Sequence, residues 1–359
     1  MKYSGAKLLQ AMGVVAFARR LNRGQVVILT YHGVLNSGEA DNFLSHNFVS
    51  AGIFEEHLAY ISKHYRPTAL RELIACYEKG VNPPQRAIVI TFDDGFANNY
   101  TVAYPLLRRH GIPFSIFLTT GLIGQSEAQL WTERVKRSLY YCPSTTVVIE
   151  IDGRDFSCGG GSADARAAGA RRILPALKRL PPSVRNEAVE RIEHACGRPT
   201  LRPEERERYD FLTWSQVREM AAGGVDFGSH TVRHPILSTL DDVTLWSEIV
   251  ESKKKIEDEL RQPCDAFAYP NGSPSDFGER EKRALRAAGY RCALSLIGRT
   301  NGPHADCYQL GRFNIGRPWV GAMFPAEVSG LLARGRLLRQ AMETMTFRQV
   351  RSAHEGVRT

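Results

Sequence analysis

Short apolar runs that alternate with helix-like segments are the feature that most constrains the fold of this chain. Seven runs have the composition of strands, and they cover residues 26–31, 87–92, 113–118, 225–228, 266–269, 292–296 and 308–313. The helical segments expected between them cover 54–64, 69–79, 98–110, 213–222, 241–261 and 276–288. A repeated strand–helix–strand order implies parallel strands joined by right-handed crossovers. The runs show little polar alternation, which predicts burial on both faces, as in a barrel wall.

An open, doubly wound sheet is the competing arrangement. No GxGxxG or GxxxxGK[ST] sequence follows any of the strands, which weakens the nucleotide-binding version of that fold. The 359 residues are enough for one large α/β domain. We therefore predict an α/β fold in which seven parallel strands form a barrel.

Three parts of the chain fall outside the strand–helix rhythm. Residues 121–210 combine a hairpin-like segment, a run of small residues and a charged helical stretch, so we predict an insertion that forms a lid or a substrate wall. Residues 321–359 are predicted to form a basic helical tail. Residues 1–24 are predicted to form a basic amphipathic helix that packs on the domain or rests on a membrane surface. A signal peptide is the alternative for this N-terminal segment.

The net charge and the cysteine content limit the classes of binding partner and the cellular locations that we expect. The net charge of +9 suits an anionic partner, but the basic residues are scattered and no nucleic-acid-binding motif is visible, so no nucleic acid is expected. The seven cysteines include no CxxC pair and do not form an obvious disulfide framework. We therefore expect a cytoplasmic or inner-membrane-associated protein, with a periplasmic or secreted location as the alternative.

Polar and titratable side chains lie at the ends of several predicted strands. Active sites of parallel β/α barrels form at the carboxyl ends of the strands, so these residues are expected to converge. The residues concerned are His32, Asp93, Asp94, His230, His234, Asn271 and, within the last strand, Arg312.

One carboxylate and two imidazoles among these residues form a plausible metal site. Asp94, His230 and His234 together suit Zn²⁺ first, with Co²⁺, Ni²⁺ or Fe²⁺ as alternatives, and leave coordination positions open. Asp93 would then remain uncoordinated beside the cation and act as a general base. Each motif has an ordinary explanation when taken alone, because Asp-Asp-Gly is common in turns and HxxxH is common on solvated helices.

Three motifs in order give the chain a family resemblance: TFDDG (91–95), SHTVRH (229–234) and FAYPNG (267–272). Through these motifs the chain resembles the polysaccharide deacetylases of carbohydrate esterase family 4, the NodB-type proteins. The resemblance covers roughly residues 25–320. The resemblance implies a distorted (β/α)7 barrel, a divalent metal ion and removal of N-acetyl groups from amino sugars in a glycan. It also implies that Asp93 is the catalytic base, that Asp94, His230 and His234 bind the metal, and that Thr91 and Ser229 support them.

The chain departs from the family pattern at two points. The family's third motif contains an arginine that orients the base, but the matching segment here, AYPN (268–271) with Tyr269 and Asn271, has none. Arg312 is the candidate to take the place of that arginine. The backbone N–H of Asn271 can still serve as an oxyanion donor, because that role does not need a particular side chain. The late Leu-x-His motif is also absent, so we expect His32, at the end of the first strand, to act as the general acid.

The expected function is therefore metal-dependent N-deacetylation of an amino sugar in a polysaccharide, oligosaccharide or lipid-linked glycan. Tyr269, Arg312 and Trp131 are the expected substrate contacts, and His46 and the other histidines are interpreted as surface or core residues. Two alternatives stay open: a hydrolase of cyclic amides or imides with the same fold, and a glycan-binding pseudoenzyme.

Overall fold

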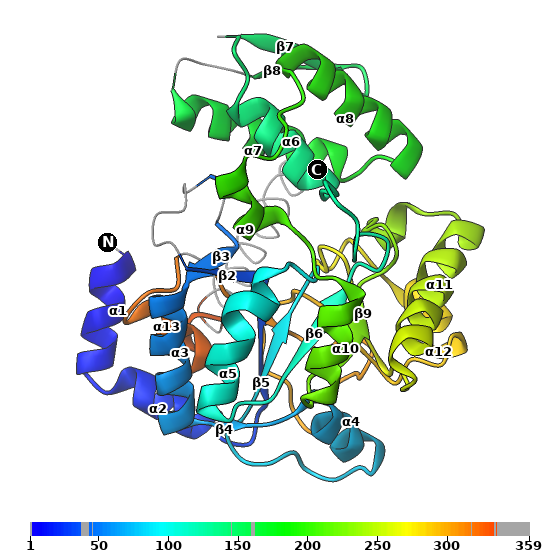
Figure 1. The fold of residues 1–359 in the computed structure, drawn as a ribbon. Helices are drawn as coiled ribbons and strands as arrows, with labels where there is room; N and C mark the ends of the chain where they lie inside the picture. The colour runs from blue at the N-terminus through cyan, green and yellow to red at the C-terminus, as the bar shows by residue number, and fades with distance from the viewer. Residues whose placement is uncertain are drawn as a thin grey trace, which may run out of the picture.

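A parallel sheet of seven successive strands forms the centre of the molecule (Figure 1). The computed structural model describes residues 2–36, 43–44, 46–144, 146–158, 162–316, 318–333 and 335. The strand order is β11-β10-β9-β6-β5-β1-β12, and the short β4 (Arg66–Pro67) also pairs with β5. The seven strands are β1 (Val27–Tyr31), β5 (Ala87–Phe92), β6 (Phe114–Leu118), β9 (Asp226–Ser229), β10 (Ala266–Ala268), β11 (Cys292–Leu294) and β12 (Phe313–Asn314).

The two ends of the sheet meet through the segment that leads into β12. Phe313 pairs with Leu29 of β1, whereas Leu310, three residues earlier, forms a parallel bridge with Leu294 of β11. The N–H of Ser295 also donates to the carbonyl of Leu310 at 2.8 Å. The sheet therefore curls into a distorted barrel, and the predicted α/β barrel is confirmed.

Helices surround the sheet at the places predicted for them. They are α3 (Ala51–His64), α4 (Leu70–Glu78), α5 (Tyr104–His110), α10 (Trp214–Ala222), α11 (Asp242–Leu260) and α12 (Glu279–Ala287). The helix predicted over 98–110 differs in detail, because a π-helical turn (Asn99–Ala103) precedes α5. All residues of β1, β5 and β6 are buried, as expected for strands covered on both faces.

The N-terminal segment forms two helices instead of the one predicted. These are α1 (Lys2–Ala11) and α2 (Val14–Leu21), and Gly13 between them has a φ of 74°, which interrupts the helix. Val15 and Ala18 are buried, whereas Leu8, Met12, Phe17 and Leu21 are exposed. Among the described residues, no helix is long and apolar enough to cross a membrane.

The segment between β6 and β9 forms a second unit with its own apolar core. It contains α6 (Trp131–Tyr140), the hairpin β7 (Val147–Ile151) and β8 (Arg154–Cys158), α7 (Ala163–Leu177), α8 (Pro182–Cys196) and α9 (Arg206–Tyr209). Figure 1 shows this unit standing over one end of the barrel. Arg137 of α6 is buried and donates to Glu205 at 3.0 Å, which ties α6 to the segment that returns to the barrel.

Smaller elements complete the described chain. The strands β2 (Gly33–Leu35) and β3 (Phe48–Ser50) pair with each other, and α13 (Met323–Val328) packs against α1. The seven cysteines are unpaired. Most of the tail predicted over 321–359 lies outside the described residues.

Candidate active site

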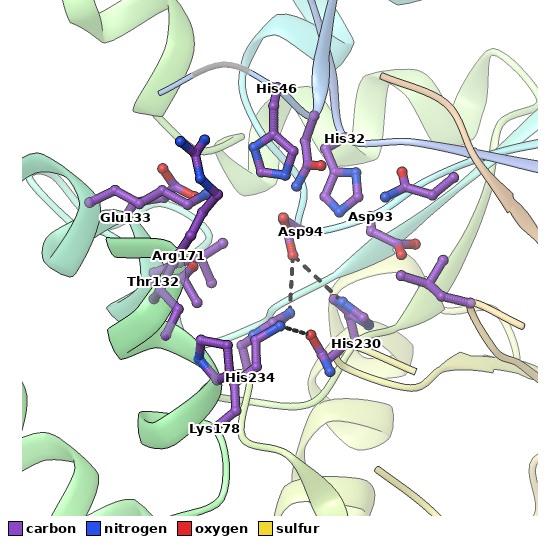
Figure 2. Close-up of a pocket in the computed structure, with 18 of the residues that line it drawn as sticks. His32, His46, Asp93, Asp94, Thr132, Glu133, Arg171, Lys178, His230 and His234 are labelled. Atoms are coloured by element: carbon purple, nitrogen blue, oxygen red, sulfur yellow. Dashed lines mark hydrogen bonds and ion pairs between the residues drawn. The ribbon is translucent and has the colours of Figure 1, made fainter. Parts of the chain in front are cut away.

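The polar residues that follow the strands meet in one cavity of about 500 Å³. Asp93 and Asp94 follow β5, His230 follows β9, and His32 follows β1. Figure 2 shows that these side chains converge from different strands, as the parallel topology predicts. Asn271, beyond β10, lines the same cavity.

Asp94, His230 and His234 form a group that fits a divalent cation. Asp94 Oδ1 lies 3.5 Å from His230 Nε2 and 3.5 Å from His234 Nε2. The ligand atoms of the three residues lie within 4.8 Å of one another. Asp94 Oδ1 is buried without a hydrogen-bond partner among the described residues. Burial and the neighbouring Asp93 raise the pKa of Asp94, and a cation would offset both effects.

A hydrogen bond at the second ring nitrogen of His230 orients this imidazole. Nδ1 lies 2.7 Å from the carbonyl oxygen of Ala268, which can only accept a hydrogen bond. Nδ1 therefore carries the proton, and the lone pair of Nε2 points towards Asp94. This arrangement is typical of metal-binding histidines, whose other nitrogen donates to a carbonyl or a carboxylate.

The backbone adopts the left-handed conformation at several positions of the site. Eight described non-glycine residues have a positive φ, and four of them are Asp94 (73°), Thr231 (70°), His234 (58°) and Asn271 (63°). This conformation is costly for residues with a Cβ, and such strain is concentrated at functional sites. The loops therefore hold their side chains in positions that a relaxed turn would not give.

Buried polar groups hold the loop that carries the two histidines. The carboxylate of Glu248 on α11 accepts hydrogen bonds from the N–H groups of Val232 (2.8 Å) and Arg233 (2.9 Å). Ser229 Oγ accepts from the N–H of Thr231 at 3.2 Å and lies 2.7 Å from Ser252 Oγ. The supporting position expected for Ser229 thus has a clear structural basis.

Asp93 is held by a buried arginine from the other end of the sequence. Arg312 Nη1 and Nη2 donate to the two carboxylate oxygens of Asp93 at 2.7 and 2.8 Å. Arg312 also donates to Thr91 Oγ1 (3.2 Å) and to the carbonyl of Ser295 (3.1 Å). Burial is the largest single influence and raises the pKa of Asp93, but the charge and hydrogen bonds of Arg312, together with the nearby His230 and His32, hold the pKa below its ordinary value. Asp93 is therefore an ionised carboxylate of fixed orientation.

His32 is a half-buried, neutral imidazole in the same cavity. Burial is the main cause that lowers the pKa of His32 to about 4, although the charge of Asp93 opposes this shift. Its Nδ1 has no hydrogen-bond partner among the described residues. Because His32 is neutral at pH 7, it has to gain a proton during a reaction before it can act as an acid.

Asn271 lines the cavity and uses its side chain to join two loops. Its Nδ2 donates to Asp276 Oδ2 at 2.6 Å, and its Oδ1 accepts a hydrogen bond from Lys178 of the insertion. Within the described part of the chain, no group accepts the backbone N–H of Asn271. That N–H is therefore available to a ligand.

Three expected substrate contacts are absent from the described wall of the cavity. Trp131 is buried in the insertion and its ring faces the guanidinium of Arg185 at 4.8 Å. Tyr269 is also buried, stacks on Phe277, and donates to the carbonyl of Tyr308. Arg312 is fully buried behind Asp93. We therefore correct all three: Trp131 and Tyr269 pack in the interior, and Arg312 positions Asp93.

The insertion supplies cavity residues that sequence reasoning missed. Helix α6 contributes Glu133 and Lys136 to the lining of the cavity. Helix α7 contributes Arg171, and Lys178 follows directly after α7. His46, interpreted from the sequence as a surface or core residue, also lines it. The positions 171, 174, 175 and 178 share one helical face, but nothing in the sequence indicates what that face meets.

A comparison with protein families identifies the chain. The family model described as polysaccharide deacetylase matches residues 80–140 and 185–293, which include both aspartates, both metal-site histidines and Asn271. The chain belongs to the polysaccharide deacetylase family. The resemblance seen in the sequence motifs is thereby confirmed.

Curated relatives of this chain agree with that assignment. It is 20% identical over 305 residues to the putative polysaccharide deacetylase YxkH of Bacillus subtilis, covering 85% of this chain and 76% of the relative. It is 26% identical over 115 residues to the poly-β-1,6-N-acetyl-D-glucosamine N-deacetylase of Staphylococcus aureus, covering 30% of this chain and 40% of the relative.

Solved structures show the same fold at low sequence identity. The deacetylase PplD of Streptococcus pyogenes, in complex with acetate, matches with a TM-score of 0.54 and 17% identity, covering 85% of this chain and 98% of PplD. IcaB from Ammonifex degensii matches with a TM-score of 0.53 and 18% identity, covering 85% and 97% of the two chains. These likenesses show that this chain has the same distorted-barrel fold as those proteins.

Proposed function

We propose that this deacetylase is a metal-dependent hydrolase that removes the N-acetyl group from an amino sugar of a glycan and releases acetate. The observation that carries the proposal is the convergence of Asp94, His230 and His234, with the ionised Asp93 next to them. The name of the staphylococcal relative, an N-deacetylase of a poly-N-acetylglucosamine, supports this substrate class. A pseudoenzyme is disfavoured because every ligand and the base are present.

The metal site would define where the acetyl group is placed. Asp94, His230 and His234 would hold the ion, with Zn²⁺ as the first candidate and Co²⁺, Ni²⁺ or Fe²⁺ as alternatives. When bound, the ion supplies Lewis-acid polarisation of the acetyl carbonyl and lowers the pKa of water.

The protein's own groups then account for the proton transfers. Asp93 accepts a proton from the water that attacks the carbonyl carbon, and Arg312 keeps the carboxylate aligned. The free N–H of Asn271 donates to the oxygen that gains negative charge. His32, which is neutral in the resting site, takes up the proton that Asp93 removed from the water and passes it to the sugar nitrogen as the carbon–nitrogen bond breaks, so that acetate and a free amine leave.

Acetate release from N-acetylated oligosaccharides, measured with and without chelation of metal, tests the proposal. Asp93→Asn is expected to retain the metal but to lose turnover by about 10²-fold or more, because a positioned base contributes 10²–10⁴. Asp155→Asn, at an exposed position of the β7–β8 hairpin, is the matched control and should keep full turnover. Near-normal turnover by Asp93→Asn would refute the assignment of the base.

A further inference from the structure

The insertion forms a charged wall that faces the metal-site residues across the cavity. Figure 2 shows Glu133, Arg171 and Lys178 on one side of the cavity and Asp93 and His230 on the other. Arg171 and Lys178 are seven residues apart, so they project from the same face of α7 and its C-terminal end. Leu174 and Pro175 lie between them on that face and also line the cavity.

Most charges around the cavity are neutralised within the protein. Lys136 donates to Glu133 at 2.7 Å, and both side chains are at most 9% exposed. Arg312 neutralises Asp93. Asp94 is the carboxylate expected to face the cation, so it is not free to neutralise a basic side chain of the wall.

Two cations of the wall remain without an acidic partner among the described residues. Arg171 forms no ion pair with any residue that the structure describes, and it is exposed at the cavity. Lys178 is only partly exposed, and its ammonium group donates to the neutral amide oxygen of Asn271. Burial lowers the pKa of Lys178, although Asp276 opposes this shift. A partly buried charge without a counter-ion is costly, and an anionic ligand would offset that cost.

We propose that Arg171 and Lys178 select an anionic substrate: a glycan with a phosphate or carboxylate group beside the N-acetylated sugar. This inference rests on the proposed function. Guanidinium groups bind phosphate and carboxylate in a bidentate manner, and an ammonium group binds them as a point charge. Leu174 and Pro175 offer an apolar surface between the two cations against which a sugar ring can pack.

The spacing of the two cations matches a substrate that extends beyond one sugar. Seven residues of α-helix rise by roughly 10 Å, so Arg171 and Lys178 meet different parts of the substrate. Lys178 contacts Asn271 and therefore lies next to the position proposed for the acetyl group, whereas Arg171 stands two helical turns earlier on α7. The negative charge is expected on the acetylated sugar itself or on the unit attached to it.

Three soluble N-acetylated substrates separate the sources of negative charge. N-acetylchitotetraose is neutral, a hyaluronan tetrasaccharide carries carboxylates, and uridine diphosphate N-acetylglucosamine carries a diphosphate at the anomeric carbon. We expect kcat/KM to be at least about tenfold higher for one of the anionic substrates, which identifies the charged group. The preference should decrease at high salt, because mobile ions screen exposed charges.

Variants that remove one charge test whether Arg171 and Lys178 cause the preference for anionic substrates. Arg171→Gln and Lys178→Gln are each expected to lower the ratio of anionic to neutral kcat/KM by about tenfold, mainly through KM. Arg179→Gln removes one charge next to Lys178 without touching the described cavity wall, so its ratio should equal that of the wild type. An equal loss in Arg179→Gln, or equal use of neutral and anionic substrates by the wild type, would overturn the proposal.

Binding measured without turnover keeps this test separate from that of the proposed function. Isothermal titration calorimetry of the metal-free protein with the anionic sugars should show weaker binding for Arg171→Gln than for Arg179→Gln. If this difference is found but no substrate releases acetate, the proposed function fails and the anion preference stands. If acetate is released but neither binding nor kcat/KM depends on Arg171 or Lys178, the anion preference fails alone.

Discussion

Replacing Arg312 with methionine tests how the base is held, because it removes the charge but retains an unbranched side chain. Arg312 is fully buried, and the side chain of Asp93 is 2% exposed. The variant loses both hydrogen bonds to Asp93 and those to Thr91 and Ser295. It also leaves the carboxylate of Asp93 buried without its counter-charge.

The expected loss of stability follows from this burial. Removing one partner of a buried, hydrogen-bonded ion pair costs about 3–5 kcal/mol of unfolding free energy. A domain has about 5–15 kcal/mol in total, so the variant should fold but with a clearly lowered midpoint of denaturation. Turnover should decrease by about 10²-fold or more, because Asp93 loses the orientation and the ionised state that a base requires.

Urea denaturation followed by circular dichroism measures the free energy, and acetate release measures the turnover. Arg291→Met is the matched control, because Arg291 pairs at the surface with Glu78 and Asp265, and the three side chains are 42%, 43% and 32% exposed. An exposed pair contributes at most about 1 kcal/mol. The double variant Asp93→Asn/Arg312→Met should recover part of the lost stability, since it leaves no unpaired charge.

The reasoning fails if Arg312→Met costs no more than Arg291→Met, or if the folded Arg312→Met variant retains nearly full turnover. The first result would mean that the ion pair is not desolvated as the structure shows. The second would mean that Asp93 does not need Arg312 in order to work.

Three further predictions concern the metal loop, acid sensitivity and the N-terminal helices. Glu248→Gln should weaken zinc affinity by about tenfold in a competition titration with a chelator, because its carboxylate holds the loop of His230 and His234; unchanged affinity would argue against this support. Burial lowers the pKa of His57 to about 4, so the unfolded chain takes up the proton first. The contribution of His57 to the free energy of unfolding is therefore fully present above about pH 6.5 and decreases by up to ~3 kcal/mol as the pH falls towards 4. Denaturation curves of His57→Gln should show a shallower pH dependence of that free energy. An unchanged slope would contradict the prediction. Membrane contact of the N-terminal helices also stays a prediction, and the exposed Leu8 and Phe17 support it. The protein should co-sediment with vesicles that contain anionic lipid, and Phe17→Ser should co-sediment less. Equal sedimentation of both proteins would exclude a role for Phe17.

Much of the barrel could be predicted because its strands carry a strong local signal. A strand covered on both faces is apolar along its length, so the runs at 87–92 and 113–118 differ clearly from the helices that follow them. Asp93 and Asp94 stand out because two adjacent carboxylates end such a run. Parallel topology then requires that residues after different strands meet at one end of the barrel.

Other predictions failed where a side chain's surroundings depend on distant parts of the chain. Trp131 and Tyr269 were expected at the substrate because they are aromatic, but the same property suits them to the interior, where they lie. His46 was interpreted as a surface or core residue, although it lines the cavity. The helix predicted over 1–24 is interrupted at Gly13, and a glycine in a helical pattern does not by itself indicate a break.

By itself, the amino-acid sequence determined the parallel barrel, the end of it that carries chemistry, and the aspartates and histidines suited to a cation. These features follow from local composition and from the geometry shared by all parallel strands. Only the tertiary structure decided that Arg312 reaches Asp93 across 219 residues, and that Arg171 and Lys178 of the insertion face the same cavity. Such contacts depend on how packed units are oriented, and neither hydrophobic periodicity nor motif spacing contains that orientation.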